Sequence, residues 1–395
     1  MANTKTSALN ALAGASIDAE ADYVPWLDSS ASELKKVLAG NIRSMLIEPN
    51  VLINGGFDFA QRQTPGTLTA ITNDKYSADR WRISRETASL QYARIDTNGA
   101  LETGLTGRYY GQFKQITSAG KFAIYQPVEA INTFPLASRV VSFQCKLKAS
   151  SSKTIRLGLV QLNSSGTVDT INATAVPTWG SNSTDPTLAT NHARITPSAA
   201  VSNGSVSGSG ISCSVTTSWQ QFGGVFTMPS NAKNIIPMLW TDSQFSANDS
   251  LYVAEAGLYD GSALRAWLPR STQYELLLCQ RMYEKSYDEA TAPGTATIAA
   301  GASLFHTTNT IASGDHCGRT AYMARKRATP TVSIYGYAGS SNVLSRADNG
   351  TELAANSATV TGSGQAGFTI YNNSGGSVTT GSAAVFWNWT SDAEL

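Results

Sequence analysis

Charge is scarce in this sequence, and the two signs balance. Charged side chains make up 14% of the 395 residues, and 29 Lys and Arg stand against 28 Asp and Glu, which gives a formal net charge of +1. A chain with this balance has no overall field that draws it to nucleic acid or to an anionic membrane surface. We therefore expect no nucleic-acid partner.

Cysteine and histidine are also few. No two of the 4 cysteines have the two-residue spacing that zinc and redox sites use. Of the 3 histidines, His306 and His316, which is followed by Cys317, lack a recognisable metal-ligand spacing. We expect no metal or other cofactor, and free, mostly buried thiols at Cys145, Cys213, Cys279 and Cys317.

Signatures of common catalytic sites are missing. The sequence has no Gly-x-Ser-x-Gly turn between a strand and a helix, no glycine-rich phosphate loop and no dinucleotide-binding pattern. Glycan cleavage needs a pair of carboxylates, and Asp and Glu are sparse in the strand-like regions. We interpret the chain as non-enzymatic.

Long apolar runs are absent too. The polar residues 1–7 lack the apolar core of a secretory signal peptide, and no later stretch approaches the roughly 20 apolar residues of a membrane span. We expect synthesis in the cytoplasm without a signal peptide, and no membrane insertion.

Short strand-like patterns separated by Gly, Asn and Ser fill the sequence instead. Residues 51–53 end in the turn Asn54-Gly55-Gly56, and alternating runs follow without helical blocks between them. This pattern predicts a mainly β fold whose central domain, residues 49–262, is an antiparallel β-sandwich. The runs are residues 89–95, 121–126, 140–147, 155–160, 219–226, 235–240 and 251–259.

The remaining parts of the chain differ from this domain. Residues 1–48 are too short to bury a core, and they include a helical pattern over 31–38. Residues 263–290 form a linker with a helix predicted over 273–286. Residues 291–395 predict a smaller C-terminal β domain.

Three stretches carry a resemblance to a known family. They are residues 50–62 with residues 76–81, residues 266–286, and residues 391–395. In their order and their positions at domain edges, they resemble tail-fibre or minor virion structural proteins of tailed bacteriophages and prophages. The sandwich between the first two stretches of that family is similar to the jelly-roll carbohydrate-binding modules of glycanases, so the resemblance implies a jelly-roll-like central domain.

The resemblance also implies a function. The chain is then a virion protein, a fibre-type appendage subunit that is made in the bacterial host and attached to the particle by its N-terminal segment. Tyr23, Trp26 and Leu27 are the candidate attachment residues. The implied partners are other virion proteins of the tail or a head adaptor, further copies in a homotrimer, and host surface polysaccharide.

Two alternatives remain open at this point. In the first, the protein is a glycan-cleaving depolymerase whose carboxylates the sequence does not reveal. In the second, it is an architectural head-decoration or cement protein without a receptor. Time-dependent release of reducing ends distinguishes the first alternative, and binding to particles but not to host cells distinguishes the second.

Candidate glycan-binding residues come from two places. The polar stretch 163–214 predicts long loops beside one edge of the sandwich, where Trp179 offers a flat ring next to Asn182 and Asp185. Asp79 and Trp81 offer a carboxylate and a second ring, with Arg80 between them. The competing interpretations are that Trp179 fixes the loops, and that Asp79-Arg80-Trp81 is an internal ion pair beside a core tryptophan.

Two further features favour packing over binding. The Asn54-Gly55-Gly56 turn is expected to place Phe57 in the core. Trp387 and Trp389, two residues apart in a strand-like run, share one face. Together with Phe368 and Tyr371, these two rings are expected to contribute to a contact between subunits.

Overall fold

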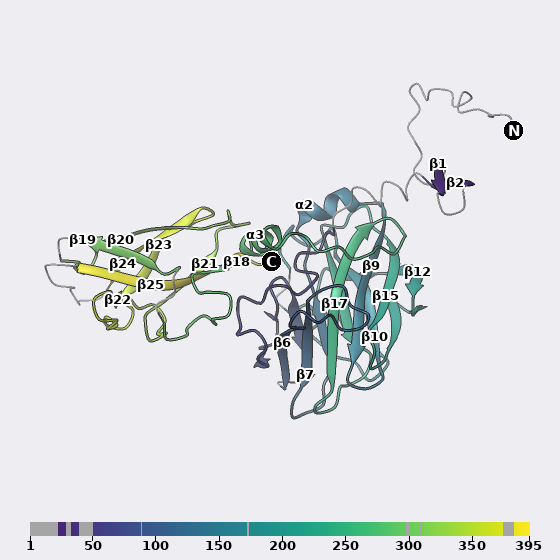
Figure 1. Cartoon of the computed structure of the whole chain (residues 1–395), viewed down its shortest axis with the longest axis horizontal. Helices are drawn as coiled ribbons and strands as arrows, with labels where there is room; N and C mark the ends of the chain where they lie inside the picture. The colour runs from purple at the N-terminus through teal and green to yellow at the C-terminus, as the bar shows by residue number, and fades with distance from the viewer. Residues whose placement is uncertain are drawn as a thin grey trace, which may run out of the picture.

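Two antiparallel sheets packed face to face form the larger part of this chain (Figure 1). This computed structural model confirms the predicted mainly β fold and its antiparallel sandwich. The residues that the structure describes are 23–28, 33–38, 50–87, 89–171, 174–297, 301–307, 310–373 and 383–395.

The first sheet of the sandwich has eight strands. Seven of them follow one path, and β11 (His192–Ile195) pairs with β10 outside it. The path runs through β13 (Gly204–Ser207), β14 (Gly210–Val215), β10 (Lys153–Leu162), β16 (Asn234–Thr241), β8 (Phe122–Tyr125), β5 (Arg82–Arg85) and β4 (Lys75–Tyr76).

The second sheet has seven strands and presents the surface that matters below. Its path runs through β12 (Pro197–Ser202), β15 (Gln220–Thr227), β9 (Val140–Ala149), β17 (Ser250–Asp260), β7 (Tyr109–Gln115), β6 (Leu90–Asp96) and β3 (Thr69–Ala70).

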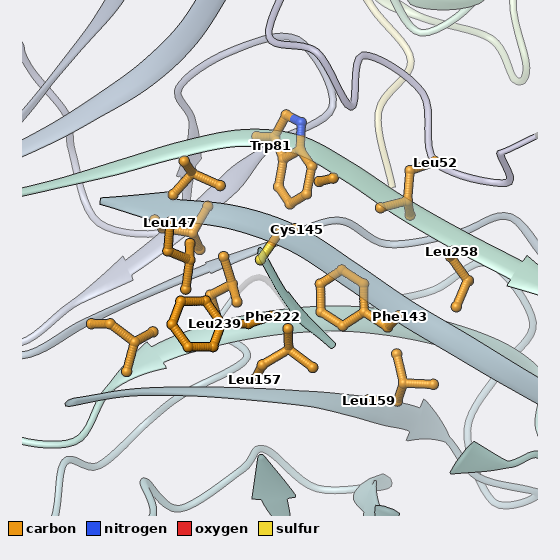
Figure 2. Close-up of a cluster of buried hydrophobic side chains, with 14 of the residues drawn as sticks. Leu52, Trp81, Phe143, Cys145, Leu147, Leu157, Leu159, Phe222, Leu239 and Leu258 are labelled. Atoms are coloured by element: carbon orange, nitrogen blue, oxygen red, sulfur yellow. The ribbon is translucent and has the colours of Figure 1, made fainter. Parts of the chain in front are cut away.

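Alternation along the strands builds the core between the two sheets. On β9, Phe143, Cys145 and Leu147 point inward and are at most 1% exposed. Figure 2 shows them packed with Leu157 and Leu159 of β10. Burial of such side chains stabilises the sandwich by about 25 cal/mol for each Å² of apolar surface removed from water.

The turn after residue 53 behaves as expected, whereas the strand before it does not form. Phe57 is fully buried, and its backbone N–H donates to the carbonyl oxygen of Asn54 at 3.1 Å. Residues 51–53 form bends rather than a strand, because their backbone bonds to scattered partners, among them Gln126, whose side chain accepts from Ile53 and donates to it.

The polar stretch 163–214 is only partly a set of loops. Its second half contributes strands β11 to β14 at the edges of both sheets. Its first half lies over the outer face of the eight-stranded sheet, where Ala175 and Val176 pack against Ile236 and Met238 of β16. Short polar side chains therefore did not prevent this stretch from pairing and packing.

The helix expected over residues 31–38 is wrong. Strand β1 (Tyr23–Asp28) pairs with β2 (Glu33–Leu38) in an antiparallel hairpin, in which Tyr23 lies opposite Leu38. Pairing between strands overrides the modest helix propensity of these residues.

The C-terminal domain is a second, smaller pair of sheets. Strand β25 (Ala383–Asp392) is the centre of a five-stranded sheet and pairs with four other strands. The remaining sheet has the order β20, β24, β23. The other bounds are β18 (Tyr283–Lys285), β19 (Ser303–Thr307), β21 (Thr331–Tyr335), β22 (Ser345–Arg346), β20 (His316–Ala321), β24 (Gly367–Asn372) and β23 (Ala358–Gly364).

Aromatic rings of this domain are used within it. Trp387, Trp389 and Phe368 are 2%, 5% and 1% exposed and belong to its own core. The shared burial of the two tryptophans agrees with the packing interpretation. These three rings leave little surface for the subunit contact that their number had suggested.

Helix α3 (Thr272–Gln280) joins the two domains and lies between them in Figure 1. The predicted helix is thus present, although it ends earlier than residue 286 because β18 pairs with β25. Two short helical turns, α2 (Ala130–Thr133) and η2 (Phe134–Leu136), lie at one end of the sandwich. Arg281, which caps α3, bonds to Glu129 at 2.9 Å.

All four cysteines are free and buried, as predicted. Burial raises the pKa of the Cys213 thiol to about 12, which keeps it protonated and unreactive. Among the described residues, no helix is long and apolar enough to cross a membrane.

Candidate functional site

The outer face of the seven-stranded sheet carries the candidate site. Side chains that alternate with the core residues point outward here, and several are partly exposed. They are Trp219, Lys148, Tyr252, Gln112, Lys114 and Gln91. The outer face of the eight-stranded sheet is covered by the loop that contains Ala175 and Val176. The outer face of the seven-stranded sheet is therefore the one on which the sandwich offers a broad polar and aromatic surface.

Strand register aligns four of these side chains. Tyr252 of β17 lies opposite Lys148 of β9 on one side and opposite Gln112 of β7 on the other. Gln220 lies opposite Leu147, so the residue before it, Trp219, falls beside Lys148. We call Trp219, Lys148, Tyr252 and Gln112 the outer row; it runs from the residue before β15 across the three adjacent strands β9, β17 and β7.

Three aromatic rings surround the ammonium group of Lys148. Its Nζ atom lies 4.9 Å from the ring centroid of Trp219, 4.8 Å from that of Tyr252 and 5.4 Å from that of Tyr110. The Tyr110 ring meets that of Trp219 edge to face at 5.3 Å. Cation–π and edge-to-face contacts of this kind hold flat rings in fixed orientations.

Glu102 links this aromatic cluster to the loop that precedes β7. Its Oε2 accepts hydrogen bonds from Lys148 Nζ at 2.5 Å and from Trp219 Nε1 at 2.7 Å. Its Oε1 accepts one from the Tyr110 hydroxyl at 2.8 Å. Burial alone raises the pKa of the Glu102 carboxyl, but these hydrogen bonds outweigh it and lower the pKa below the ordinary value.

A second carboxylate, Glu255, fixes the same loop. It sits in β17 with a positive φ of 51°, where the register between β17 and β9 shifts. Its Oε1 accepts from the Thr106 hydroxyl at 2.9 Å and from the Gly107 N–H at 2.8 Å. Its Oε2 pairs with Lys146 Nζ at 2.7 Å. The bulge thus turns a side chain towards the loop and holds it over the sheet.

A hollow of about 390 Å³ opens between this loop and the segment before β15. Its lining combines one large ring with an ammonium group, a carboxylate and three hydroxyls. The lining residues are Glu102, Thr103, Gly104, Lys148, Thr217, Ser218 and Trp219. A preorganised ring flanked by hydrogen-bonding groups suits a ligand with apolar C–H faces and hydroxyl edges.

Asp79 and Trp81, two of the expected binding residues, do not reach the surface. Both are 0% exposed. Asp79 lies 3.8 Å from Arg62 and accepts a hydrogen bond from Gln61, while the Trp81 ring stacks on Phe57. Neither side chain is available to a glycan, which corrects the expectation of a site here. Their burial matches the competing interpretation, an internal ion pair beside a core tryptophan.

The loop residues Trp179, Asn182 and Asp185 lie on the opposite sheet from the hollow. Trp179 is partly buried against the cluster under its own loop. Asp185 accepts a hydrogen bond from Trp240 Nε1 at 3.1 Å, and Asn182 accepts one from the Gln244 N–H at 3.2 Å. These contacts attach the loop to the sheet, and the structure does not bring the three residues together with the outer row.

The expected attachment residues Tyr23, Trp26 and Leu27 all fall in β1. Their side chains lie outside the described residues. No group of three or more His, Cys, Asp or Glu side chains within the described part of the chain is placed to hold a metal ion.

Sequence reasoning missed the outer row. The sequence did carry one signal for this row. Tyr110 and Tyr252 occupy outward-facing positions of strands whose residues alternate between the core and the outer face, and a polar residue is usual at such positions. The neighbourhood of Glu102, Lys148 and Trp219 depends on strand pairs far apart in sequence, and no local pattern reveals it.

Comparisons with known proteins find no match in sequence, since neither a family model nor a curated protein matches the chain. Several solved structures are similar over about half of this chain. Tailspike protein 4 of bacteriophage CBA120, solved as its enzymatically active domain, is similar over 54% of this chain, with 10% identity and a TM-score of 0.31. The alignment covers 21% of that chain, so this protein spans about a fifth of the tailspike domain.

Two carbohydrate-binding modules are similar over nearly their whole length. The C-terminal family 22 module of Clostridium thermocellum Xyn10B aligns over 51% of this chain and 97% of its own, at 11% identity and a TM-score of 0.29. The CBM22-1 xylan-binding domain of Paenibacillus barcinonensis Xyn10C aligns over 55% and 97%, at 10% identity and a TM-score of 0.28.

Proposed function

We propose that this chain is a structural subunit of a bacteriophage particle, a fibre-type appendage protein whose sandwich binds host-surface glycan without cleaving it. The observation that carries the glycan part of the proposal is the outer row with its hollow. It presents a fixed indole ring, that of Trp219, beside charged and hydroxyl groups on an uncovered sheet face.

The physical argument rests on how sugars are recognised. A pyranose ring has apolar C–H faces that stack on an aromatic ring and hydroxyl edges that need donors and acceptors. Trp219 supplies the ring, and Thr103, Thr217 and Ser218 supply exposed hydroxyls around it. Because Glu102 already holds the indole N–H, the ring loses little conformational entropy when a ligand binds.

The virion part of the proposal is supported by the sequence stretches that resemble tail-fibre proteins. The hairpin β1–β2 fits an attachment role, since an isolated two-stranded hairpin is at best marginally stable in water and gains from a partner. We include the homotrimer in the proposal, and light scattering should then give the mass of three chains. The mass of a single chain at micromolar concentration would rule out the homotrimer.

The test of the glycan role compares Trp219→Ala with the wild-type protein. Fluorescently labelled protein is incubated with cells of a panel of bacterial strains and then with polysaccharide extracted from each strain it binds. Trp219→Ala should lower the affinity at least about tenfold, since central aromatic anchors carry more than about 1 kcal/mol of binding energy. Trp219→Phe keeps a ring and should retain part of the affinity.

Tyr274→Ala serves as the matched control, because Tyr274 is an aromatic residue of α3 with 54% exposure, away from the outer row. It should bind like the wild-type protein. If no strain in the panel is bound, or if Trp219→Ala binds as tightly as the wild type, the glycan role is refuted.

The absence of cleavage is tested on the same polysaccharide. Reducing ends should stay at the level of a protein-free sample over many hours at 37 °C. An increase with time that scales with protein concentration would establish the depolymerase alternative instead.

A further inference from the structure

The outer row continues into a cluster of hydrogen-bond donors at its far end. Lys114 of β7 lies directly opposite Gln91 of β6 and opposite Ser250 of β17. Gln112, the last member of the outer row, precedes Lys114 by two residues and so shares its face. Gln91, Gln112 and Lys114 are all partly exposed. We call these three residues the donor cluster.

The charges along this face are unevenly matched. The two carboxylates near the hollow are already occupied, Glu102 by Lys148 at 2.5 Å and Glu255 by Lys146 at 2.7 Å. Lys114, in contrast, forms no ion pair with any residue that the structure describes. The donor cluster therefore carries one positive charge that no described ion pair compensates, and Glu102 and Glu255 are both paired with other lysines.

Hydrogen-bonding capacity points the same way. Gln112 Nε2 donates one bond to the Ser250 hydroxyl at 3.2 Å and retains a second N–H. Lys114 offers an ammonium group with three donors, and Gln91 offers a side-chain amide. One cation and two amides on the same sheet face offer donors to an anionic acceptor, because hydrogen bonds with an ionised partner are about twice as strong as neutral ones.

The spacing allows one ligand to contact both ends. Trp219 lies next to β9, and Lys114 lies on β7, with β17 between these two strands. Neighbouring strands are about 4.8 Å apart, so the two side chains are separated by roughly 15 Å across the sheet. Lys114 also lies two residues beyond Gln112 along β7, so a short oligosaccharide that crosses the strands obliquely spans the distance between the two ends.

We propose that the ligand of this face is an acidic glycan, in which a sugar carboxylate binds the donor cluster while another sugar ring, further along the same oligosaccharide, stacks on Trp219. This inference rests on the proposed glycan role and adds the class of glycan. A carboxylate fits better than a phosphate, since the donor cluster contains a single cation and no arginine, whose planar fork suits phosphate.

The test uses the polysaccharide that the wild-type protein binds in the strain panel. One half of the preparation is treated with carbodiimide and borohydride, which converts its carboxylates to alcohols and leaves the rest of the polymer unchanged. Lys114→Gln should bind the untreated polymer about tenfold more weakly than the wild type, the loss expected for one charge-assisted hydrogen bond. Wild type and Lys114→Gln should bind the reduced polymer equally and weakly.

Lys75→Gln is the matched control, because Lys75 is an exposed lysine of β4 on the other sheet and its replacement changes the net charge by the same amount. It should leave binding unchanged. Wild-type binding that survives carboxyl reduction, or a Lys114→Gln variant that binds as tightly as the wild type, overturns the acidic-glycan inference. Loss of binding in Trp219→Ala alone would still uphold the proposed glycan role.

Discussion

Arg80 and Glu394 form an ion pair that is buried on both sides, with 1% and 4% of the two side chains exposed. Arg80 belongs to the sandwich, whereas Glu394 follows β25 of the C-terminal domain. Arg62 lies 3.1 Å from Asp392 and 3.5 Å from Glu394 in the same cluster. The end of β25 and the residues after it are thus attached to the sandwich by ion pairs, of which Arg80–Glu394 is buried.

Removal of one partner of this pair should be costly. Arg80→Ala leaves the carboxylate of Glu394 buried and short of one cation, which should lower the free energy of unfolding by about 3–5 kcal/mol. Urea denaturation followed by tryptophan fluorescence measures the loss. Arg108→Ala, which breaks a solvent-exposed pair with Asp96, should lower the free energy of unfolding far less, because water screens exposed charges. Equal losses in the two variants would contradict the role given to the buried pair.

Asp58 should make stability depend on pH. Burial, together with the nearby Glu275 carboxylate, raises the pKa of Asp58 from 3.8 to about 6. A carboxyl with a raised folded-state pKa stabilises the fold fully below pH 3.8, and this contribution is lost as the pH rises through about 6. The loss corresponds to about 3 kcal/mol at neutral pH.

Replacement of this carboxyl provides the measurement. Asp58→Asn should match the wild type near pH 4 and become increasingly more stable than it up to pH 7, as read from urea midpoints at each pH. A stability difference that does not change across this range would show that Asp58 titrates near its ordinary pKa in the folded protein.

Glu255 should control the loop over the hollow. Glu255→Ala removes the acceptor for Thr106 and Gly107 and leaves Lys146 without its carboxylate. We expect a loss of about 3 kcal/mol in the free energy of unfolding, faster hydrogen exchange at the amides of both loop residues, and weaker polysaccharide binding. Glu255→Gln retains one side-chain acceptor, so its free energy of unfolding should lie between those of the wild type and Glu255→Ala. Unchanged exchange at Thr106 and Gly107 would contradict the prediction.

The N-terminal segment should be dispensable for folding and required for assembly. Deletion of residues 1–45 removes β1 and β2, whereas the core of the sandwich begins at Leu52. The truncated protein should unfold like the full chain but fail to join particles in an in vitro assembly reaction. Normal incorporation of the truncated protein would refute the attachment role of this segment.

Local alternation was sufficient to predict the sandwich. The outward and inward positions of β9, such as Lys146 and Leu147, are visible in the sequence because each strand has one buried face. The same logic failed at Leu34 and Leu38, whose spacing also fits a helix, and only pairing with β1 decides between the two structures. Local pattern therefore predicts strands best where a core selects one face.

The candidate site could not be predicted from the sequence, for a different reason. Glu102 and Trp219 are 117 residues apart, and they meet because β9 and β7 both pair with β17. Trp179, the ring that the polar sequence around it had singled out, instead packs under its own loop. Composition predicted a loop here, but which loops remain open to a ligand depends on which sheet face each one covers.

The position of β25 has a mechanical consequence for an appendage. This strand is the centre of its sheet, and its last residue, Asp392, and Glu394 just beyond it form ion pairs with the sandwich. A force that pulls the C-terminal domain away from the sandwich along this strand loads its hydrogen bonds to β18 and β21 in shear, since ladder bonds lie perpendicular to the strand. Bonds loaded in shear share the force and must break together, so the junction resists tension better than a flexible linker would.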